Sequence, residues 1–279
     1  MRVSVHGVHL EVAQWGQGPA VMALHGAPGL LDHTYLRRAL EPLGLPVRWI
    51  LWDQRGSGRS DEGPPEGLTH RQMVADWAGL REALGLGPAI LLGHSYGGFF
   101  ALEAALRHPD QVTALILCTT APSHRFFDGF LESVSRFVPQ DAWRRLTDPA
   151  LTGPQPSLIR ELAAAFGALL FARENVALAE RLLAGTVAHP AVARRLARET
   201  RASYDLEPLL GQIRCPTLVV GGLHDRVTAP RWSEVMARAI PGAELVLFPS
   251  SGHLPMVEEA ALFARTVEAF LRRHRLLGS

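Results

Sequence analysis

Gly93-His94-Ser95-Tyr96-Gly97 lies between a short apolar run, residues 88–92, and a longer run with helical spacing, residues 98–106. A serine at the centre of G-x-S-x-G, leaving a strand and entering a helix, is the usual setting of a catalytic serine nucleophile. The turn at such a serine is tight, and the glycines two residues away on each side leave room for the backbone. The N–H groups that open the following helix face any negative charge that forms beside the serine. The sequence therefore predicts a strand–turn–helix unit that carries Ser95 as a nucleophile.

Short, fully apolar runs recur on both sides of this turn and alternate with helical patterns such as residues 73–84. Runs of this kind are typical of buried parallel strands. Their alternation with helices predicts an α/β fold with a mostly parallel, doubly wound sheet. An alternating stretch from Val3 to Val12 with a glycine near its centre predicts an opening β-hairpin. The buried strands are expected at residues 20–24, 47–52, 89–92, 114–117, 217–220 and 244–248.

One long stretch lacks any strand-like run. Between about Ala121 and Glu207 the chain has Ala-, Leu- and Arg-rich segments with helical spacing, such as residues 157–174 and 176–183. A helical insertion between two strands predicts a lid over the carboxyl ends of the strands, where open α/β sheets bind their ligands. We therefore expect a core domain, residues 1–120 and 209–279, and a helical lid domain, residues 121–208.

Composition and charge exclude several classes of function. Of the 279 residues, 47% are hydrophobic and 20% are charged, which is typical of a globular protein with an ample core. The net charge is +1, and no basic run is long enough to follow a phosphate backbone, so we expect no nucleic-acid partner. All 28 basic residues are arginine. The lack of lysine excludes Schiff-base chemistry and any phosphate loop that depends on lysine.

The chain shows no sign of export or of a membrane segment. Its N-terminal residues lack the apolar core of a signal peptide, and no apolar run is long enough to span a bilayer. Cys118 and Cys215 lie in or beside apolar runs, and we expect them in the core rather than in a disulfide. We therefore expect a cytoplasmic protein with no membrane partner, no cofactor and no metal. The sequence leaves open whether the protein forms a homo-oligomer.

A serine nucleophile needs a base and an acid that orients the base. Asp225 follows one of the late apolar runs and His253 follows the last of them, so both are expected at the carboxyl ends of strands. The pattern resembles that of α/β-hydrolases, in which the triad residues come in the chain order Ser, Asp, His. Asp205 is a competitor for the acid, but it lies in the exit of the lid rather than after a strand. We therefore predict a triad of Ser95, His253 and Asp225.

The oxyanion hole is expected from the loop His25-Gly26-Ala27-Pro28-Gly29, which directly follows the run of residues 20–24. We predict the backbone N–H of Ala27 as one donor and that of Tyr96, just after the nucleophile, as the other. His25 is expected to bond its own loop. His94 is expected to pack beneath the turn, because adjacent residues on a turn point apart.

A second glycine-rich loop, residues 53–60, reads D-Q-R-G-S-G-R-S in one-letter code. It is no phosphate cradle, because neither G-K-[ST] nor the strand–GxGxxG–helix spacing is present. We expect a rigid turn with Asp53 and Arg55 in buried ion pairs. Ser60 is a weak candidate nucleophile because it lacks the strand–turn–helix setting.

These motifs resemble those of the α/β-hydrolase superfamily over the full length of the chain, and within it those of the proline iminopeptidase (prolyl aminopeptidase) group. That group carries H-G-G-P-G, D-Q-R-G-x-G-x-S and G-G-S-W-G-G motifs, which residues 25–29, 53–60 and 93–98 resemble. Here Ala27 and His94 stand in place of glycines and Tyr96 in place of a tryptophan. In the lid, residues 171–175 resemble the group's F-A-R-I-E-N segment with one residue missing. The resemblance implies that Glu174 binds the free amino terminus of the substrate.

Two enzymatic functions follow from these motifs. The first is an aminopeptidase that releases N-terminal proline, or another small residue, from short peptides. The second is a carboxylesterase or carbon–carbon bond hydrolase that uses the same triad on small uncharged substrates, and aromatic lid residues suit it equally well. Those residues are Phe126, Phe127, Phe130, Phe137, Trp143 and Phe166.

Other functions on the same scaffold are disfavoured. Haloalkane dehalogenases and epoxide hydrolases need an aspartate where Ser95 stands, so their chemistry is excluded. A binding protein on an inactive hydrolase scaffold is disfavoured because every catalytic position holds a competent residue. The expected partner is therefore a small peptide or ester substrate.

Overall fold

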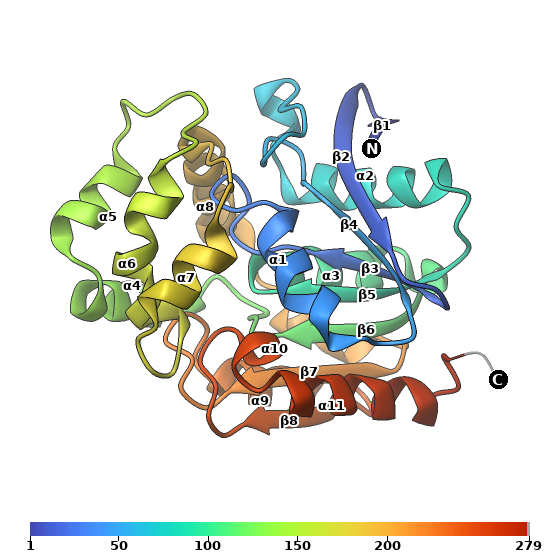
Figure 1. The fold of residues 1–279 in the computed structure, drawn as a ribbon. Coiled ribbons are helices and arrows are strands. Elements are labelled where there is room, and N and C mark those ends of the chain that lie inside the picture. Colours follow the sequence, from blue (N-terminus) through green and yellow to red (C-terminus); the bar gives the residue numbers. More distant parts are fainter. Residues whose placement is uncertain (278–279) are drawn as a thin grey trace.

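The computed structural model describes residues 1–277, apart from the side chains of residues 160–162, and in this part of the chain the strands form one eight-stranded sheet (Figure 1). The strand order is β1-β2-β4-β3-β5-β6-β7-β8. The strands from β4 to β8 run parallel, whereas β1 and β2 form an antiparallel hairpin at one edge. The expected α/β fold with a mostly parallel sheet is therefore confirmed. The strands are β1 (Arg2–Val5), β2 (Val8–Trp15), β3 (Ala20–Leu24), β4 (Arg48–Trp52), β5 (Ala89–His94), β6 (Val112–Cys118), β7 (Thr217–Gly222) and β8 (Glu244–Phe248).

Helices cover both faces of the sheet. Along β3, Val21 and Ala23 belong to an apolar cluster with α1 and α11, whereas Met22 and Leu24 belong to a second cluster with α2, α3 and α9. The alternation follows from the two-residue period of a strand, which sends successive side chains to opposite faces. The helices of the core are α1 (His33–Leu40), α2 (His70–Ala83), α3 (Tyr96–Arg107), α9 (Arg231–Ala239), α10 (Pro255–Glu258) and α11 (Ala260–Arg273), with short 3-10 turns η1 (Glu41–Leu43), η2 (Pro65–Gly67), η3 (Pro109–Gln111) and η4 (Glu207–Gln212).

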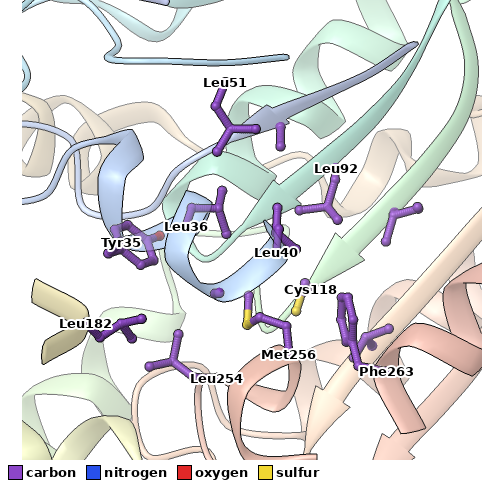
Figure 2. Packing of buried hydrophobic residues seen from close by; sticks show 14 of the residues in the cluster. Tyr35, Leu36, Leu40, Leu51, Leu92, Cys118, Leu182, Leu254, Met256 and Phe263 are labelled. Atoms are coloured by element: carbon purple, nitrogen blue, oxygen red, sulfur yellow. The ribbon is translucent and has the colours of Figure 1, made fainter. Parts of the chain in front are cut away.

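The apolar cluster that contains Val21 and Ala23 also joins the sheet to α10. Figure 2 shows Leu36 and Leu40 of α1 together with Leu92 of β5, Cys118 of β6 and Met256 of α10. All five are buried. Cys118 and the half-buried Cys215 are free thiols. This packing links α1 and α10 to the central strands of the sheet.

Most of the predicted element bounds differ from the observed ones by a few residues. The strands β3 and β8 coincide with the prediction, and β5 continues two residues further, through Gly93 and His94. Neither residue favours strands by itself. The extension is explained by pairing with β6, in which Gly93 lies opposite Leu117 and His94 opposite Cys118.

Five helices follow β6 and precede β7 in the described chain, and no strand lies among them. In Figure 1 they gather at the left, beyond one end of the sheet. The predicted helical run 157–174 is α6 followed by a non-helical connection, because the helix ends at Leu170. The division into core and lid at residues 121 and 208 stays a prediction. The five helices are α4 (Phe126–Phe137), α5 (Gln140–Thr147), α6 (Leu158–Leu170), α7 (Val176–Leu183) and α8 (Pro190–Ser203).

Within residues 1–277 no helix has the length and apolarity needed to cross a membrane.

Candidate active site

Ser95 occupies the turn between β5 and α3, with φ 54° and ψ −126°. Positive φ is strained for a residue with a side chain, and such strain is typical of a nucleophile turn. The surrounding backbone explains the glycines. A Cβ on Gly97 would lie 2.2 Å from the carbonyl oxygen of Leu24, and one on Gly93 would lie 2.5 Å from the Cα of Gly98. The glycine spacing in the sequence therefore reflects close approach of three backbone segments around Ser95.

Asp225 and His253 meet in the loops that follow β7 and β8. His253 Nδ1 lies 2.9 Å from Asp225 Oδ2, and both side chains are buried. The carboxylate also accepts hydrogen bonds from the N–H groups of Val227 and Thr228 and from the Thr228 hydroxyl. Because Nδ1–H donates to the carboxylate, Nε2 of the neutral imidazole has a free lone pair. This is the arrangement of a base that is oriented by an acid.

The structure also brings Ser95 to His253, since both line one cavity. Among the described residues no hydrogen bond joins the Ser95 hydroxyl to the imidazole. In unliganded sites this contact is often long and tightens when substrate binds.

The predicted oxyanion loop packs against Ser95. A Cβ on Gly26 would lie only 2.8 Å from the Ser95 Cβ. Ala27 adopts φ 44° and, like Tyr96, lines the cavity. In the described part of the chain the backbone N–H groups of Ala27 and Tyr96 donate to no other backbone group. Two free N–H groups beside a nucleophile are suited to bind an oxyanion.

A buried hydrogen-bonded relay joins the loops of the site. The Gly26 N–H donates to the Tyr35 hydroxyl at 2.7 Å, and that hydroxyl donates to His94 Nδ1 at 2.6 Å. His94 Nε2–H then donates to the His253 carbonyl oxygen at 3.0 Å. The direction is fixed because a carbonyl oxygen only accepts, so Nε2 carries the proton and Nδ1 accepts.

The relay requires a neutral His94 imidazole, since Nδ1 accepts a hydrogen bond and Nε2–H donates one. Burial, followed by the nearby His253, lowers the pKa of His94 to about 3, so its imidazole is neutral near pH 7. His94 packs beneath the turn, as expected, but its hydrogen bonds also make it a link between loops. Tyr35 was missed by the sequence analysis because no motif marks it: its hydroxyl reaches the site only through the packing of α1.

The other histidine of the oxyanion loop is structural, as expected. His25 Nδ1 donates to the Gly26 carbonyl oxygen at 2.9 Å, and Nε2 accepts from the Gln54 N–H at 3.2 Å. Burial lowers the pKa of His25, so the neutral imidazole joins the two glycine-rich loops.

Arg55 lies in a buried ion pair, as expected, whereas the buried partner of Asp53 is a histidine. Arg55 holds Asp76 through two hydrogen bonds of 2.8 Å, and His33 Nδ1 lies 2.5 Å from Asp53 Oδ1. The hydroxyl of Ser60 donates to the Asp53 carbonyl oxygen at 2.6 Å. The loop of residues 53–60 is therefore a rigid turn, and its serine is occupied in holding it.

A cavity of about 460 Å³ lies between Ser95 and the lid. Its lining is largely apolar. The charged side chains that line it, among those described, are arginines of α8, and no described carboxylate lines it. Five of the six aromatic lid residues named from the sequence line the cavity, and Phe137 does not. The aromatic lining comprises Phe126, Phe127, Phe130, Trp143 and Phe166 from the lid, with Tyr35, Tyr96 and Phe99 from the core, and the arginines are Arg194, Arg198 and Arg201.

Glu174 lies outside this cavity. It is exposed in the connection between α6 and α7 and is not part of the lining. The Ala172 N–H donates to Glu258 Oε1 at 2.7 Å, and Arg226 donates to the Phe171 carbonyl oxygen at 3.0 Å. These bonds tie residues 171–172 to α10 and to the loop that carries Asp225, and Glu174 is exposed to solvent. The structure therefore does not bring the expected amine anchor to Ser95.

Within residues 1–277, no group of three or more His, Cys, Asp or Glu side chains is placed to hold a metal ion.

Comparison with known proteins agrees with the geometry of the fold. Residues 19–260 match the family model of the alpha/beta hydrolase fold. The chain belongs to the α/β-hydrolase fold family. Proline iminopeptidase PfmaB of Pestalotiopsis fici is 30% identical over 97% of this chain and 99% of the relative, so the expected resemblance to proline iminopeptidases is confirmed.

Members of the family with other names are as similar. A 2-hydroxymuconate semialdehyde hydrolase of a Pseudomonas species is 30% identical over 95% of this chain and 91% of the relative. Among solved structures, an esterase from Exiguobacterium antarcticum superposes with a TM-score of 0.72 at 27% identity, covering 96% of this chain and 97% of that one. Membership of the α/β-hydrolase fold family thus establishes a hydrolase, and the substrate must be argued from the cavity.

Proposed function

We propose that this hydrolase cleaves carboxylic esters through a triad of Ser95, His253 and Asp225. The observation that carries the proposal is the lining of the cavity in front of Ser95. The described side chains that line it are mostly apolar, the charged ones are arginines, and none is a carboxylate. Such a lining favours an apolar acyl group, and it offers no counter-charge to a substrate ammonium group, whose burial without one is costly.

The first half of the reaction forms an acyl-enzyme. Ser95 Oγ attacks the ester carbonyl carbon while its proton moves to His253 Nε2, the nitrogen that the hydrogen bond to Asp225 leaves unprotonated. The negative charge on the carbonyl oxygen is stabilised by the N–H groups of Ala27 and Tyr96. The imidazolium, held by the Asp225 carboxylate, then returns the proton to the alkoxide as the C–O bond breaks.

The second half regenerates the enzyme. Water attacks the acyl carbon, its proton passes to His253 Nε2, and Ser95 Oγ leaves with the proton from the imidazolium. The products are the acid and the alcohol. The apolar lid limits the access of bulk water and so strengthens every electrostatic interaction in the site.

An aminopeptidase is the second candidate, and it is favoured by the similarity to proline iminopeptidases and by the D-Q-R-G loop. An aminopeptidase recognises a free ammonium group, which calls for a carboxylate within reach of Ser95. Glu174, the residue expected for this role, is exposed and outside the cavity. The ester hydrolase is therefore the better-supported function.

Three substrates distinguish the two functions: a short-chain p-nitrophenyl ester, proline p-nitroanilide and an N-blocked form of that anilide. We expect turnover of the ester and no preference for the free amine. Ser95→Ala should reduce ester turnover by about 10³-fold or more. Ser60→Ala is the matched control and should keep the activity, since its hydroxyl bonds the backbone of Asp53.

Two results would overturn the proposal. If Ser95→Ala still hydrolyses the ester, Ser95 is not the nucleophile. Efficient cleavage of proline p-nitroanilide, lost on blocking the amine and faster than ester cleavage, would establish the aminopeptidase. In that case Glu174→Gln should reduce cleavage of the free-amine substrate more than that of the ester.

A further inference from the structure

Three arginines on one face of α8 line the cavity, and no described carboxylate lines it with them. We propose that this arginine face, defined as Arg194, Arg198 and Arg201, binds a carboxylate of the substrate. The preferred substrate is then an anionic monoester of a dicarboxylic acid, with an apolar spacer between the scissile ester and the free carboxylate. The inference rests on the proposed ester-hydrolase function and names its substrate class.

The spacing of the arginines places them together. Positions 194, 198 and 201 are separated by four and three residues, so they share one face of a helix. The same face presents Ala193 and Ala197 to the cavity. Alanine side chains are short, so the charged groups of this face are the long guanidinium arms. Arg198 and Arg201 are exposed and Arg194 is half-buried, which places the charges at the edge of the cavity rather than at its floor.

Their positive charges are not neutralised by described acidic groups. Arg194 donates to the carbonyl oxygens of Asp148 at 2.7 Å and Leu151 at 2.8 Å, which orients its guanidinium without opposing its charge. Arg201 lies over the ring of Phe127 at 5.0 Å. Arg198 has no hydrogen bond or ion pair with any described residue.

On other helices of this protein, several arginines form ion pairs with acidic residues of the same helix or the residue just after it. Arg37, Arg238 and Arg272 each pair with a glutamate four residues away in the sequence. On α8 the residue four positions after Arg194 is another arginine, and like charges at this spacing destabilise a helix. The cationic face therefore carries a small cost in helix stability, which a bound anion would remove.

The nearest acidic group on α8 does not remove the charge. Both carboxylate oxygens of Glu199 accept the His70 N–H at 3.1 Å, and this side chain is not part of the cavity lining. A substrate carboxylate at the cavity edge would therefore meet two unpaired guanidinium groups, which are suited to bidentate binding of carboxylates. The reacting ester would meanwhile lie in the apolar interior near Ser95.

The effect should appear in KM, because the arginine face is expected to contact the substrate away from the reacting carbonyl. Exposed ion pairs are individually weak, so each arginine is expected to contribute roughly a 2- to 5-fold preference. Added salt should weaken the preference, because the charges face solvent.

The test compares mono-p-nitrophenyl glutarate with p-nitrophenyl butyrate. We expect the double variant Arg198→Ala/Arg201→Ala to raise the KM ratio of the anionic to the neutral ester by roughly 5- to 20-fold at low salt. Arg195→Ala is the matched control, because it lies on the same helix outside the cavity lining, and it should leave that ratio unchanged. Wild-type protein in 0.5 M NaCl should lose most of the preference, where ~0.5 M salt shortens the screening length to a few ångströms.

A binding measurement keeps this inference separate from the proposed function. Glutarate binding to Ser95→Ala, followed by calorimetry, should weaken in the double variant and not in Arg195→Ala. If no ester is turned over but this difference in binding remains, the ester-hydrolase proposal fails and the arginine face stands. If the double variant leaves both the KM ratio and glutarate binding unchanged, the arginine face is refuted.

Discussion

Replacing Tyr35 by phenylalanine should test whether the buried relay holds the active site together. The change removes a single oxygen atom, yet that oxygen makes two hydrogen bonds, from the Gly26 N–H and to His94 Nδ1. Gly26 precedes the proposed oxyanion donor Ala27, and His94 precedes Ser95. The substitution therefore loosens both loops that flank the reacting carbonyl while the ring still packs in the core.

The magnitude follows from the two polar atoms left behind. A buried donor or acceptor without a partner costs about 1–3 kcal/mol, which sets an upper limit of roughly 6 kcal/mol for the pair. Tyr35 lines the cavity, so water can replace part of the loss. We expect a loss of about 2–4 kcal/mol in the free energy of unfolding. Small displacements of catalytic groups are expensive, and we expect kcat to fall by roughly 10- to 100-fold.

Urea denaturation gives the stability, and steady-state hydrolysis of a p-nitrophenyl ester gives kcat. Tyr204→Phe is the matched control: its hydroxyl is also buried, but it donates one hydrogen bond, to the Ala121 carbonyl oxygen at 3.0 Å. That variant should lose only about 1 kcal/mol, since a single ordinary hydrogen bond is removed. Equal stability losses in the two variants, with kcat unchanged in Tyr35→Phe, would refute the relay.

Three further perturbations have defined outcomes. The pKa of His94 is about 3 in the folded state and about 6.5 in the unfolded chain, so the unfolded chain binds the proton first as the pH drops. The free energy of unfolding should therefore fall between about pH 6.5 and pH 3, by up to about 1.4 kcal/mol per pH unit. His94→Gln should reduce this pH dependence, measured by urea denaturation at several pH values. Arg55→Met leaves the buried carboxylate of Asp76 without its guanidinium partner and should lower the free energy of unfolding by about 3 kcal/mol, measured in the same way. Gly97→Ala places a methyl group 2.2 Å from the Leu24 carbonyl oxygen and should cost about 1–3 kcal/mol, with slower labelling of Ser95 by a fluorophosphonate; unchanged stability and labelling would contradict the packing argument.

The elements that the sequence predicted well are those set by local chemistry. The strand β8 and the helix α7 have the bounds expected from their apolar patterns, because period and side-chain size act within a few residues. The turn at Ser95 was predictable for the same reason. Its glycines are required by backbone contacts that any strand–turn–helix unit of this kind makes.

The predictions that depended on distant partners were less complete. Glu174 was expected at the amine of the substrate because of a local resemblance, but its place is set by the bonds that hold Ala172 to Glu258. Nor could the sequence tell that Arg55 pairs with Asp76, 21 positions away, rather than within its own loop. Such pairings depend on which loops the packing brings together, and a single sequence carries little record of them.

The sequence by itself determined the α/β fold, the tight turn at Ser95 and the order in which Asp225 and His253 follow it, because each rests on apolar periodicity or on residues that are neighbours in the chain. Only the tertiary structure decided what surrounds that turn. The Tyr35 hydroxyl enters the relay through the packing of α1, and the arginine face enters the cavity through the way α8 lies across it. Both are contacts between side chains far apart in sequence, and their geometry exists only once the sheet and the lid have packed.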